Sequence, residues 1–257
     1  MLIRCQTFLL LSALFFSLPL SAQTDIPDPD SLVEKHITAI GGRDLYDGIL
    51  TGDIRFKESI PGNHTNEHRI LFATEDRYRY STHMSLDNRS YVRTLNKQNG
   101  WHHEIFKGKI EKLRRISFNI EEYNAFSPTG IERYVYPKTE YRNSKTVAVI
   151  NDGKKTIYEV LFDLNDSRKI REFFDKKTGL RVATWIEAYR FKVDAENPVS
   201  IRKFQYEDYK KTKYGILIPN IVKSNSSTTH DAVYKIESAI FNLELPAAEF
   251  QKPRDGD

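Results

Sequence analysis

From residue 49 onward, apolar and polar side chains alternate in short runs, which turn residues interrupt about every ten positions. In residues 77–84, for example, Tyr78, Tyr80 and Thr82 alternate with arginines and a serine. A period of two places successive side chains on opposite faces of a strand, so each run predicts a strand with one buried and one wet face. Such strands are typical of antiparallel sheets. The pattern therefore predicts a mainly β protein, built on one strongly curved antiparallel sheet of about 10–11 strands.

One or two α-helices are expected to cover this sheet. Apolar side chains recur at helical spacing over residues 31–40, and Ser31 with Glu34 has the pattern of a capping box at the start of that helix. Gly41 then ends the helix. A second helix is predicted within residues 119–127, where a cap residue and its partner precede a turn.

The first 22 residues have the pattern of a secretory signal peptide. Arg4 gives a basic start, residues 8–18 form an apolar run, and small residues follow up to Ala22. This run is too short for a membrane span, which needs about 20 residues. We therefore expect cleavage near Ala22 and a periplasmic or secreted protein that does not span a membrane. No low-complexity linker divides the strands, so residues 23–257 are predicted to form a single domain.

The cysteine count and the net charge exclude several classes of protein. The chain has one cysteine, Cys5, which lies inside the predicted signal peptide. A mature chain without cysteine cannot be a disulfide scaffold, a cysteine-based zinc module or an iron–sulfur protein. Loss of Arg4 leaves 38 basic against 35 acidic residues, a net charge of +3. So small a positive charge does not indicate nucleic-acid binding.

Motifs for catalysis or metal binding are scarce. The sequence has no Gly-x-Ser-x-Gly elbow and no glycine-rich phosphate loop. His64 and His68 are four positions apart with Glu67 between them, but the order differs from the zincin motif, so solvated loop histidines are expected there. His102 and His103 are adjacent, so in a strand their rings point to opposite faces and cannot share an ion. We expect no metal, no cofactor and no catalytic residue.

Five strings carry a family resemblance. They are Ala39-Ile40-Gly41-Gly42 with a strand from Thr51-Gly52, Asn96-Lys97-Gln98-Asn99-Gly100-Trp101, Phe174-Asp175-Lys176-Lys177-Thr178-Gly179-Leu180, residues 204–209 followed by Gly215-Ile216-Leu217-Ile218-Pro219, and Phe250-Gln251-Lys252-Pro253. In this order, over most of residues 31–253, they resemble the LolA-like superfamily of outer-membrane lipoprotein-sorting proteins. The resemblance implies a half-open antiparallel β-barrel, with helices as a lid over an apolar cavity that takes acyl chains. The sequence departs from the carrier proper at Thr74-Glu75, where the resemblance would place an Arg-Pro pair tied to lid closure.

On this resemblance we expect an exported carrier or binder of lipid or lipidated protein, not an enzyme. Its partners would be the acyl chains of lipid or lipoprotein. Moving one acyl chain of about 15 methylenes into water costs about 12 kcal/mol, so such chains need cover in an aqueous compartment. The side chains predicted to line the cavity are Ile54, Phe56, Tyr78, Tyr80, Trp101, Tyr158, Val160, Phe162, Phe204 and Tyr206.

Two alternatives remain open. An envelope protein-interaction or sensing module on the same fold, with no bound lipid, would have a filled core and would bind envelope membrane proteins at a sheet edge or at the lid. An enzyme would need a buried imidazole within hydrogen-bond reach of a carboxylate, and the neighbourhood of His102 and His103 is the candidate in the sequence.

Overall fold

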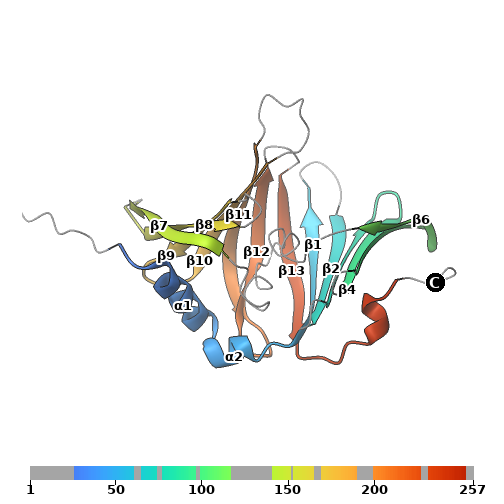
Figure 1. The fold of residues 1–257 in the computed structure, drawn as a ribbon, viewed down its shortest axis with the longest axis horizontal. Helices are drawn as coiled ribbons and strands as arrows, with labels where there is room; N and C mark the ends of the chain where they lie inside the picture. The colour runs from blue at the N-terminus through green and yellow to red at the C-terminus, as the bar shows by residue number, and fades with distance from the viewer. Residues whose placement is uncertain are drawn as a thin grey trace, which may run out of the picture.

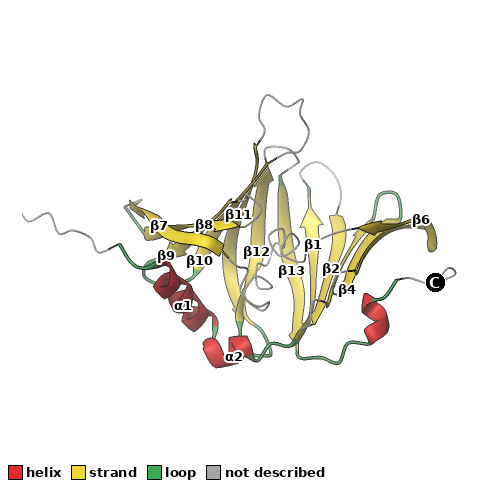
Figure 2. Cartoon of the chain, in the orientation of Figure 1, coloured by secondary structure: helices red, strands yellow, loops and turns green. Residues whose placement is uncertain are grey.

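The computed structural model describes residues 26–60, 65–73, 77–96, 99–116, 141–151, 153–164, 169–189, 199–226 and 231–252. Its helical elements are α1 (Pro29–Ile40), α2 (Arg43–Asp47) and the 3₁₀-helix η1 (Ala247–Phe250). Its strands are β1 (Thr51–Ser59), β2 (Thr65–Ala73), β3 (Arg77–Met84), β4 (Arg89–Asn96), β5 (Asn99–Phe106), β6 (Lys109–Ile116), β7 (Tyr141–Asn151), β8 (Thr156–Leu164), β9 (Lys169–Asp175), β10 (Arg181–Tyr189), β11 (Val199–Lys211), β12 (Leu217–Ser226) and β13 (Ala232–Phe241). Figure 2 shows that strands dominate these residues. The protein is therefore mainly β, as predicted.

The 13 described strands form one curved antiparallel sheet in the order β6-β5-β4-β3-β2-β1-β13-β12-β11-β10-β9-β8-β7 (Figure 1). Within β1–β6 and within β7–β13, each strand pairs with the next along the chain. The pairing of β1 with β13 joins these two halves. The edge strands β6 and β7 lie at opposite ends and do not pair, so the sheet stays half open. The predicted half-open antiparallel architecture is confirmed.

The sheet has more strands than the 10–11 that the sequence pattern predicts. The two missed strands are the edge strands, β6 and β7. Five of the eight residues of β6 are charged and most of its side chains are exposed, so this strand has no continuous apolar face to reveal it. In β7 the register shifts twice against β8, and these irregularities break the alternation with a period of two.

The helix α1 begins before its predicted capping box. Pro29 occupies the first helical turn, and the Asp28 carboxylate caps the helix by accepting the Ser31 backbone N–H at 3.1 Å. Ser31 lies inside the first turn, so the cap predicted at Ser31 with Glu34 is wrong. The predicted end is confirmed, because Gly41 follows the last helical residue with φ 146°, a conformation that favours glycine.

Helices cover the sheet in two places. The helices α1 and α2 lie beside the half of the sheet that contains β9, β10 and β12 (Figure 1), and α1 buries Leu32, Ile37 and Ile40 there. The helix η1 packs on the outer side of the other half, where Phe250 contacts Leu71 and neighbouring apolar side chains. The helix predicted within residues 119–127 lies outside the described residues. No described helix is long and apolar enough to cross a membrane.

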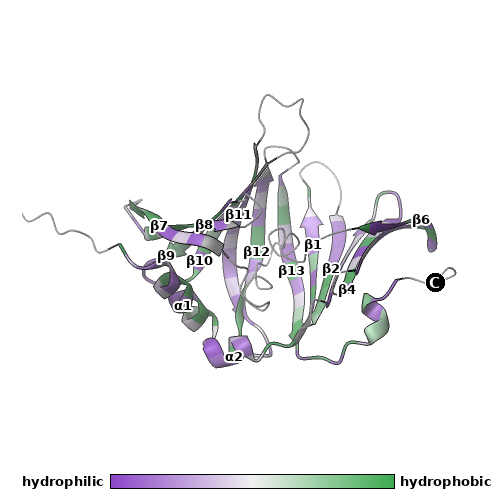
Figure 3. Cartoon of the chain, viewed as in Figure 1, coloured by the Kyte–Doolittle hydropathy of each residue, from purple (hydrophilic) through white to green (hydrophobic). Residues whose placement is uncertain are grey.

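The burial pattern follows the alternation of the sequence. Along most strands, hydrophobic and hydrophilic residues alternate (Figure 3), so one face collects apolar side chains. The main apolar cluster draws on strands of both halves of the sheet and on α1 and α2. We call the face that carries Ile54, Ile70 and Phe204, and that bears this cluster, the concave face.

A buried ion pair lies on the concave face between β9 and β10. The Arg181 Nη1 atom is 3.0 Å from Glu172 Oε1, and both side chains are at most 2% exposed. The Arg181 guanidinium also lies 4.6 Å from the centre of the Tyr206 ring. The pair thus holds two opposite charges inside the apolar cluster.

Breaking this pair on one side should destabilise the fold more than replacing both partners. We expect Glu172→Gln to lower the free energy of unfolding by about 3–5 kcal/mol, because the Arg181 charge then stays buried without its counterion. The double variant Glu172→Gln/Arg181→Met should recover much of that loss. Urea denaturation measures both. The control is Glu187→Gln, which leaves the more exposed Arg171 paired with Glu159. It should lower the free energy of unfolding by about 1 kcal/mol or less. A double-mutant cycle with the single variant Arg181→Met tests the coupling of the two side chains. If the losses of unfolding free energy in the two single variants simply added up in the double variant, the coupling would be contradicted.

Candidate functional site

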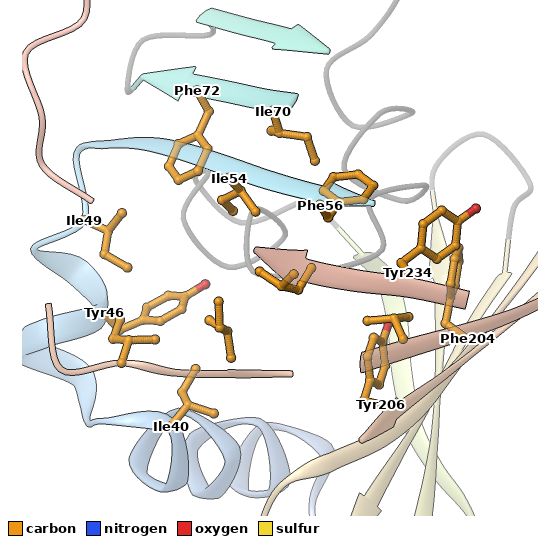
Figure 4. Close-up of a cluster of buried hydrophobic side chains, with 14 of the residues drawn as sticks. Ile40, Tyr46, Ile49, Ile54, Phe56, Ile70, Phe72, Phe204, Tyr206 and Tyr234 are labelled. Carbon is orange, nitrogen blue, oxygen red and sulfur yellow. The ribbon is translucent and has the colours of Figure 1, made fainter. Parts of the chain in front are cut away.

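Nine of the ten side chains predicted to line a cavity lie on the concave face, inside its apolar cluster. They come from both halves of the sheet and are Ile54, Phe56, Tyr78, Tyr80, Tyr158, Val160, Phe162, Phe204 and Tyr206. Figure 4 shows how Phe56, Phe204 and Tyr206 turn toward one interior, together with Ile40 and Tyr46 from α1 and α2. The fold therefore brings these nine predicted residues to one region.

Trp101 lies on the opposite, outer face of the sheet. In the β4–β5 pairing it faces Thr94, whereas its neighbour Gly100 faces the core residue Leu95. The Lys252 ammonium lies 5.3 Å from the centre of the Trp101 ring, from the segment that follows η1. The structure thus separates Trp101 from the other nine. Alternation shows which residues share a face, but the sequence did not show which face of this hairpin is buried.

Protein side chains pack the middle of the concave face closely. Ile54 and Val160 are fully buried, and Phe204 is 1% exposed. Tyr80 and Tyr158 are only partly buried at the border of the cluster. The concave face therefore carries an apolar layer that is buried in its middle and partly exposed at its borders.

A polar cluster interrupts this layer where β13, β1 and β2 run side by side. Glu58 is its centre and is buried. Its Oε2 atom accepts a hydrogen bond from Asn66 Nδ2 at 2.9 Å and lies 3.2 Å from His68 Nε2. Its Oε1 atom accepts a hydrogen bond from the Tyr234 hydroxyl at 2.9 Å. On the other side of the imidazole, the Tyr80 hydroxyl lies 2.7 Å from His68 Nδ1. We call these five residues the Glu58 cluster.

Burial and hydrogen bonding set the protonation states in the Glu58 cluster. Burial by itself would raise the pKa of Glu58, but hydrogen bonds from His68 and Asn66 outweigh it and lower that pKa to about 2. Burial raises the pKa of Tyr80 to about 12, and it also raises the pKa of Tyr234. Near neutral pH the cluster therefore holds one carboxylate among protonated phenols.

Arg202 of β11 extends the Glu58 cluster across the sheet. Its Nη2 atom donates to the Tyr234 hydroxyl oxygen at 2.9 Å, and its Nε atom donates to Ser224 Oγ at 3.4 Å. The guanidinium also lies 5.1 Å from the centre of the Phe204 ring. A chain of two hydrogen bonds thus runs from Arg202 through Tyr234 to Glu58.

The adjacent histidines of β5 face opposite sides of the sheet, as their spacing predicts. His102 accepts a hydrogen bond from Arg93 Nε at 3.3 Å and lies 3.8 Å from the nearest Glu104 oxygen, beyond hydrogen-bond reach. Burial and the Arg93 charge lower the pKa of His102, and burial with Arg79 lowers the pKa of His103 to about 4. The buried imidazole beside a carboxylate is therefore at His68, not at the β5 pair.

His68 corrects one expectation from the sequence. It is 6% exposed within β2 and stacks on Phe56 at 4.8 Å between ring centres, so it is not a solvated loop histidine. His64 lies outside the described residues. Within the residues that the structure describes, no group of three or more His, Cys, Asp or Glu side chains could hold a metal ion.

The sequence contains a signal for the Glu58 cluster that pattern analysis missed. Glu58 is in phase with Ile54 and Phe56, two residues predicted to line the cavity, and His68 is in phase with Ile70. A charged side chain in phase with an apolar face must either find partners or disrupt the fold. Such positions are therefore candidate polar clusters even before a structure is known.

A groove of about 780 Å³ lies where two β-hairpins, β7–β8 and β9–β10, turn beside β11. Four exposed lysines line it, namely Lys154, Lys155, Lys176 and Lys177. Its other lining residues include apolar Leu180 and Val182 and the carboxylate of Asp175, which the backbone N–H groups of the turn hold. Glu207 and Asp208 also line the groove, which thus combines apolar surface with four lysines and three carboxylates.

Glu58→Gln tests the charge in the Glu58 cluster. Because the folded pKa lies below the unfolded value, the ionised carboxylate stabilises the fold fully above about pH 4.5, and this contribution disappears as the pH falls toward 2. We expect the free energy of unfolding of the variant at pH 7 to be lower than that of wild type by on the order of 3 kcal/mol. The difference from wild type in urea denaturation should narrow below pH 4.5. Glu67→Gln, at an exposed position on β2, should change stability by less than about 0.5 kcal/mol. A difference for Glu58→Gln that does not depend on pH would contradict the assignment.

No protein-family model and no curated protein matches the chain. Among solved structures, a LolA superfamily protein from Nitrosomonas europaea matches with a TM-score of 0.55 and 10% identity, over 87% of this chain and 97% of that chain. An outer membrane lipoprotein-sorting protein domain from Vibrio parahaemolyticus also matches with a TM-score of 0.55, at 12% identity over 86% of this chain and 94% of that chain. At such identities, the shared property is the fold. The protein therefore has a LolA-like fold, as the five sequence strings indicated.

Proposed function

We propose that the protein is an exported carrier or binder of lipid or lipidated protein, which takes up acyl chains against its concave face. The observation that carries this proposal is the apolar layer that both halves of the half-open sheet build with α1 and α2. Rings and branched aliphatic side chains make the kind of surface on which acyl chains lose their contact with water. The nine predicted residues on this face are the proposed lining.

The sheet supplies this surface without a membrane span. No described helix could cross a membrane, and the predicted signal peptide lies outside the described residues. Export of the mature chain would place the concave face in an aqueous compartment, where acyl chains need cover. A periplasmic or secreted location belongs to the proposal for this reason.

We propose no enzymatic activity. His68 and Glu58 have the geometry of a base and its orienting carboxylate, and the Thr82 hydroxyl lies 3.1 Å from His68 Nδ1. However, the Tyr80 hydroxyl is closer to the same nitrogen, at 2.7 Å, and the raised pKa of this phenol makes it a weak nucleophile. These contacts support a structural network in preference to an activated nucleophile.

The direct test is chemical analysis of what the protein carries. The full chain, processed and purified from its native host, should release lipid on organic extraction, which mass spectrometry identifies. The purified mature protein should also bind a fluorescent fatty acid at a single class of site. Absence of lipid in the extract together with absence of fatty-acid binding would refute the proposal.

A bulky substitution on the concave face should block the site. Ala239 of β13 faces Ile54 and packs against the apolar cluster, so Ala239→Trp should fill space next to it. We expect fatty-acid binding to weaken by about tenfold, which equals about 1.4 kcal/mol. Ala183→Trp, on the outer face of β10 opposite Phe173, is the matched control and should bind as wild type does. Circular dichroism and urea denaturation establish that both variants are folded. Equal binding by both variants would place the site elsewhere.

A protein-interaction module without lipid is the second candidate. It is favoured by the close packing of the described core and by the groove, where four lysines outnumber three carboxylates and favour an acidic segment of a partner protein. Envelope membrane proteins would then be the partners. Failure of both lipid tests, combined with saturable binding of an acidic envelope-protein segment that is lost when the four lysines are replaced by glutamine, would favour this candidate.

A further inference from the structure

Arg202 differs from three other arginines that pack in the sheet. Arg69, Arg171 and Arg181 each have a carboxylate oxygen within 3.0 Å of the guanidinium. The structure shows no ion pair between Arg202 and any described Asp or Glu, and its hydrogen bonds go to the neutral hydroxyls of Ser224 and Tyr234. A partly buried guanidinium with only neutral partners retains a strong preference for an anion.

Arg202 also has N–H donors that bind no described residue. A guanidinium has five N–H donors, and the two hydrogen bonds to Ser224 and Tyr234 occupy two of them. The nearest acidic group of the network, Glu58, already accepts hydrogen bonds on both oxygens from Asn66 and Tyr234. Glu58 therefore holds the Tyr234 hydroxyl in place and is linked to Arg202 through it.

The position of Arg202 joins this charge to the apolar layer. Arg202, Phe204 and Tyr206 alternate along β11 on one face, and the guanidinium lies over the Phe204 ring. On β1 the order along the chain is reversed, with Ile54 and Phe56 followed by Glu58, but three successive antiparallel pairings make β1 run opposite to β11. The polar side chains thus meet at one border of the apolar layer.

We propose that Arg202 is a headgroup-binding residue, so that the protein prefers acyl-chain ligands with an anionic phosphate headgroup over neutral ones. The acyl chain lies along the apolar layer, and the phosphate oxygens accept hydrogen bonds from the guanidinium of Arg202. Planar guanidinium groups bind phosphate oxygens in pairs, which adds orientation as well as affinity. This inference rests on the proposed acyl-chain site and names the class of ligand that it selects.

Calorimetric titration of the mature protein with two ligands of the same acyl chain tests the inference. These are a lysophosphatidic acid and a monoacylglycerol, both used below their micelle-forming concentrations. Wild-type protein should bind the phosphate ligand at least about tenfold more tightly, the factor expected of a hydrogen bond to a charged group. In Arg202→Gln this preference should disappear, while the affinity for the monoacylglycerol stays unchanged. Arg202→Lys, which keeps the charge but loses the planar fork, should retain part of the preference.

The control variant is Arg55→Gln. Arg55 is exposed on the outer face of β1, and its partner Asp53 keeps two hydrogen bonds from Arg69. It should retain the full phosphate preference. Unchanged affinity for the monoacylglycerol shows that Arg202→Gln is folded, and urea denaturation provides a second measure.

Each other outcome has a distinct meaning. Equal binding of both ligands by wild type, or a preference that survives in Arg202→Gln, would overturn the headgroup assignment and leave the acyl-chain site standing. Binding of neither ligand would overturn the proposed function and this inference together. A third titration uses inorganic phosphate. If phosphate bound as tightly as the lysophosphatidic acid, and if Arg202→Gln abolished this binding, Arg202 would belong to a site for free anions. That result would overturn the headgroup assignment.

Discussion

The pairing of β1 with β13 is the contact on which the rest of the architecture depends. The other neighbouring strands of the described sheet are also neighbours along the chain, so local hairpins account for them. Among the described strands, only β1 and β13 join segments far apart in sequence, and this one antiparallel pairing turns two meanders into one sheet. Both the apolar layer and the Glu58 cluster draw on strands from each side of this junction. Without the junction, neither would be assembled.

The Glu58 cluster lies directly on that junction. Glu58 faces Tyr234 across the β1–β13 pairing and Asn66 across the β1–β2 pairing, and it bonds to both side chains. A register slip by one residue would turn Glu58 to the outer face and break these hydrogen bonds. An apolar contact tolerates small shifts, whereas a buried carboxylate left without donors is costly. The cluster therefore specifies the register in which the two halves join.

Much of the fold could be predicted from the sequence, and the reasons are local. Strict alternation revealed the inner strands, and Gly41 revealed the end of α1, because both follow from backbone geometry. Edge strand β6 was missed because a strand with few buried side chains needs no apolar face. Nine of the ten proposed lining residues lie together, but Trp101 does not, since alternation cannot tell which face of a hairpin is buried. Asn66 and His68 reach Glu58 across a local hairpin, but Tyr234, which links Glu58 to Arg202, comes from a strand 176 residues away, and no single stretch of the chain reveals that link.

The charges of β6 also matter for how the protein behaves at high concentration. A half-open sheet leaves edge strands whose backbone N–H and C=O groups can pair with another chain, which is a common route to aggregation. On β6, exposed Lys109, Lys112, Arg114 and Arg115 outnumber Glu111, so a second copy in such a pairing would bring together two strands of net positive charge. This repulsion disfavours edge-to-edge stacking of the protein while leaving the edge open. A strand that the sequence pattern missed thus disfavours pairing of its own edge with a second copy of the protein.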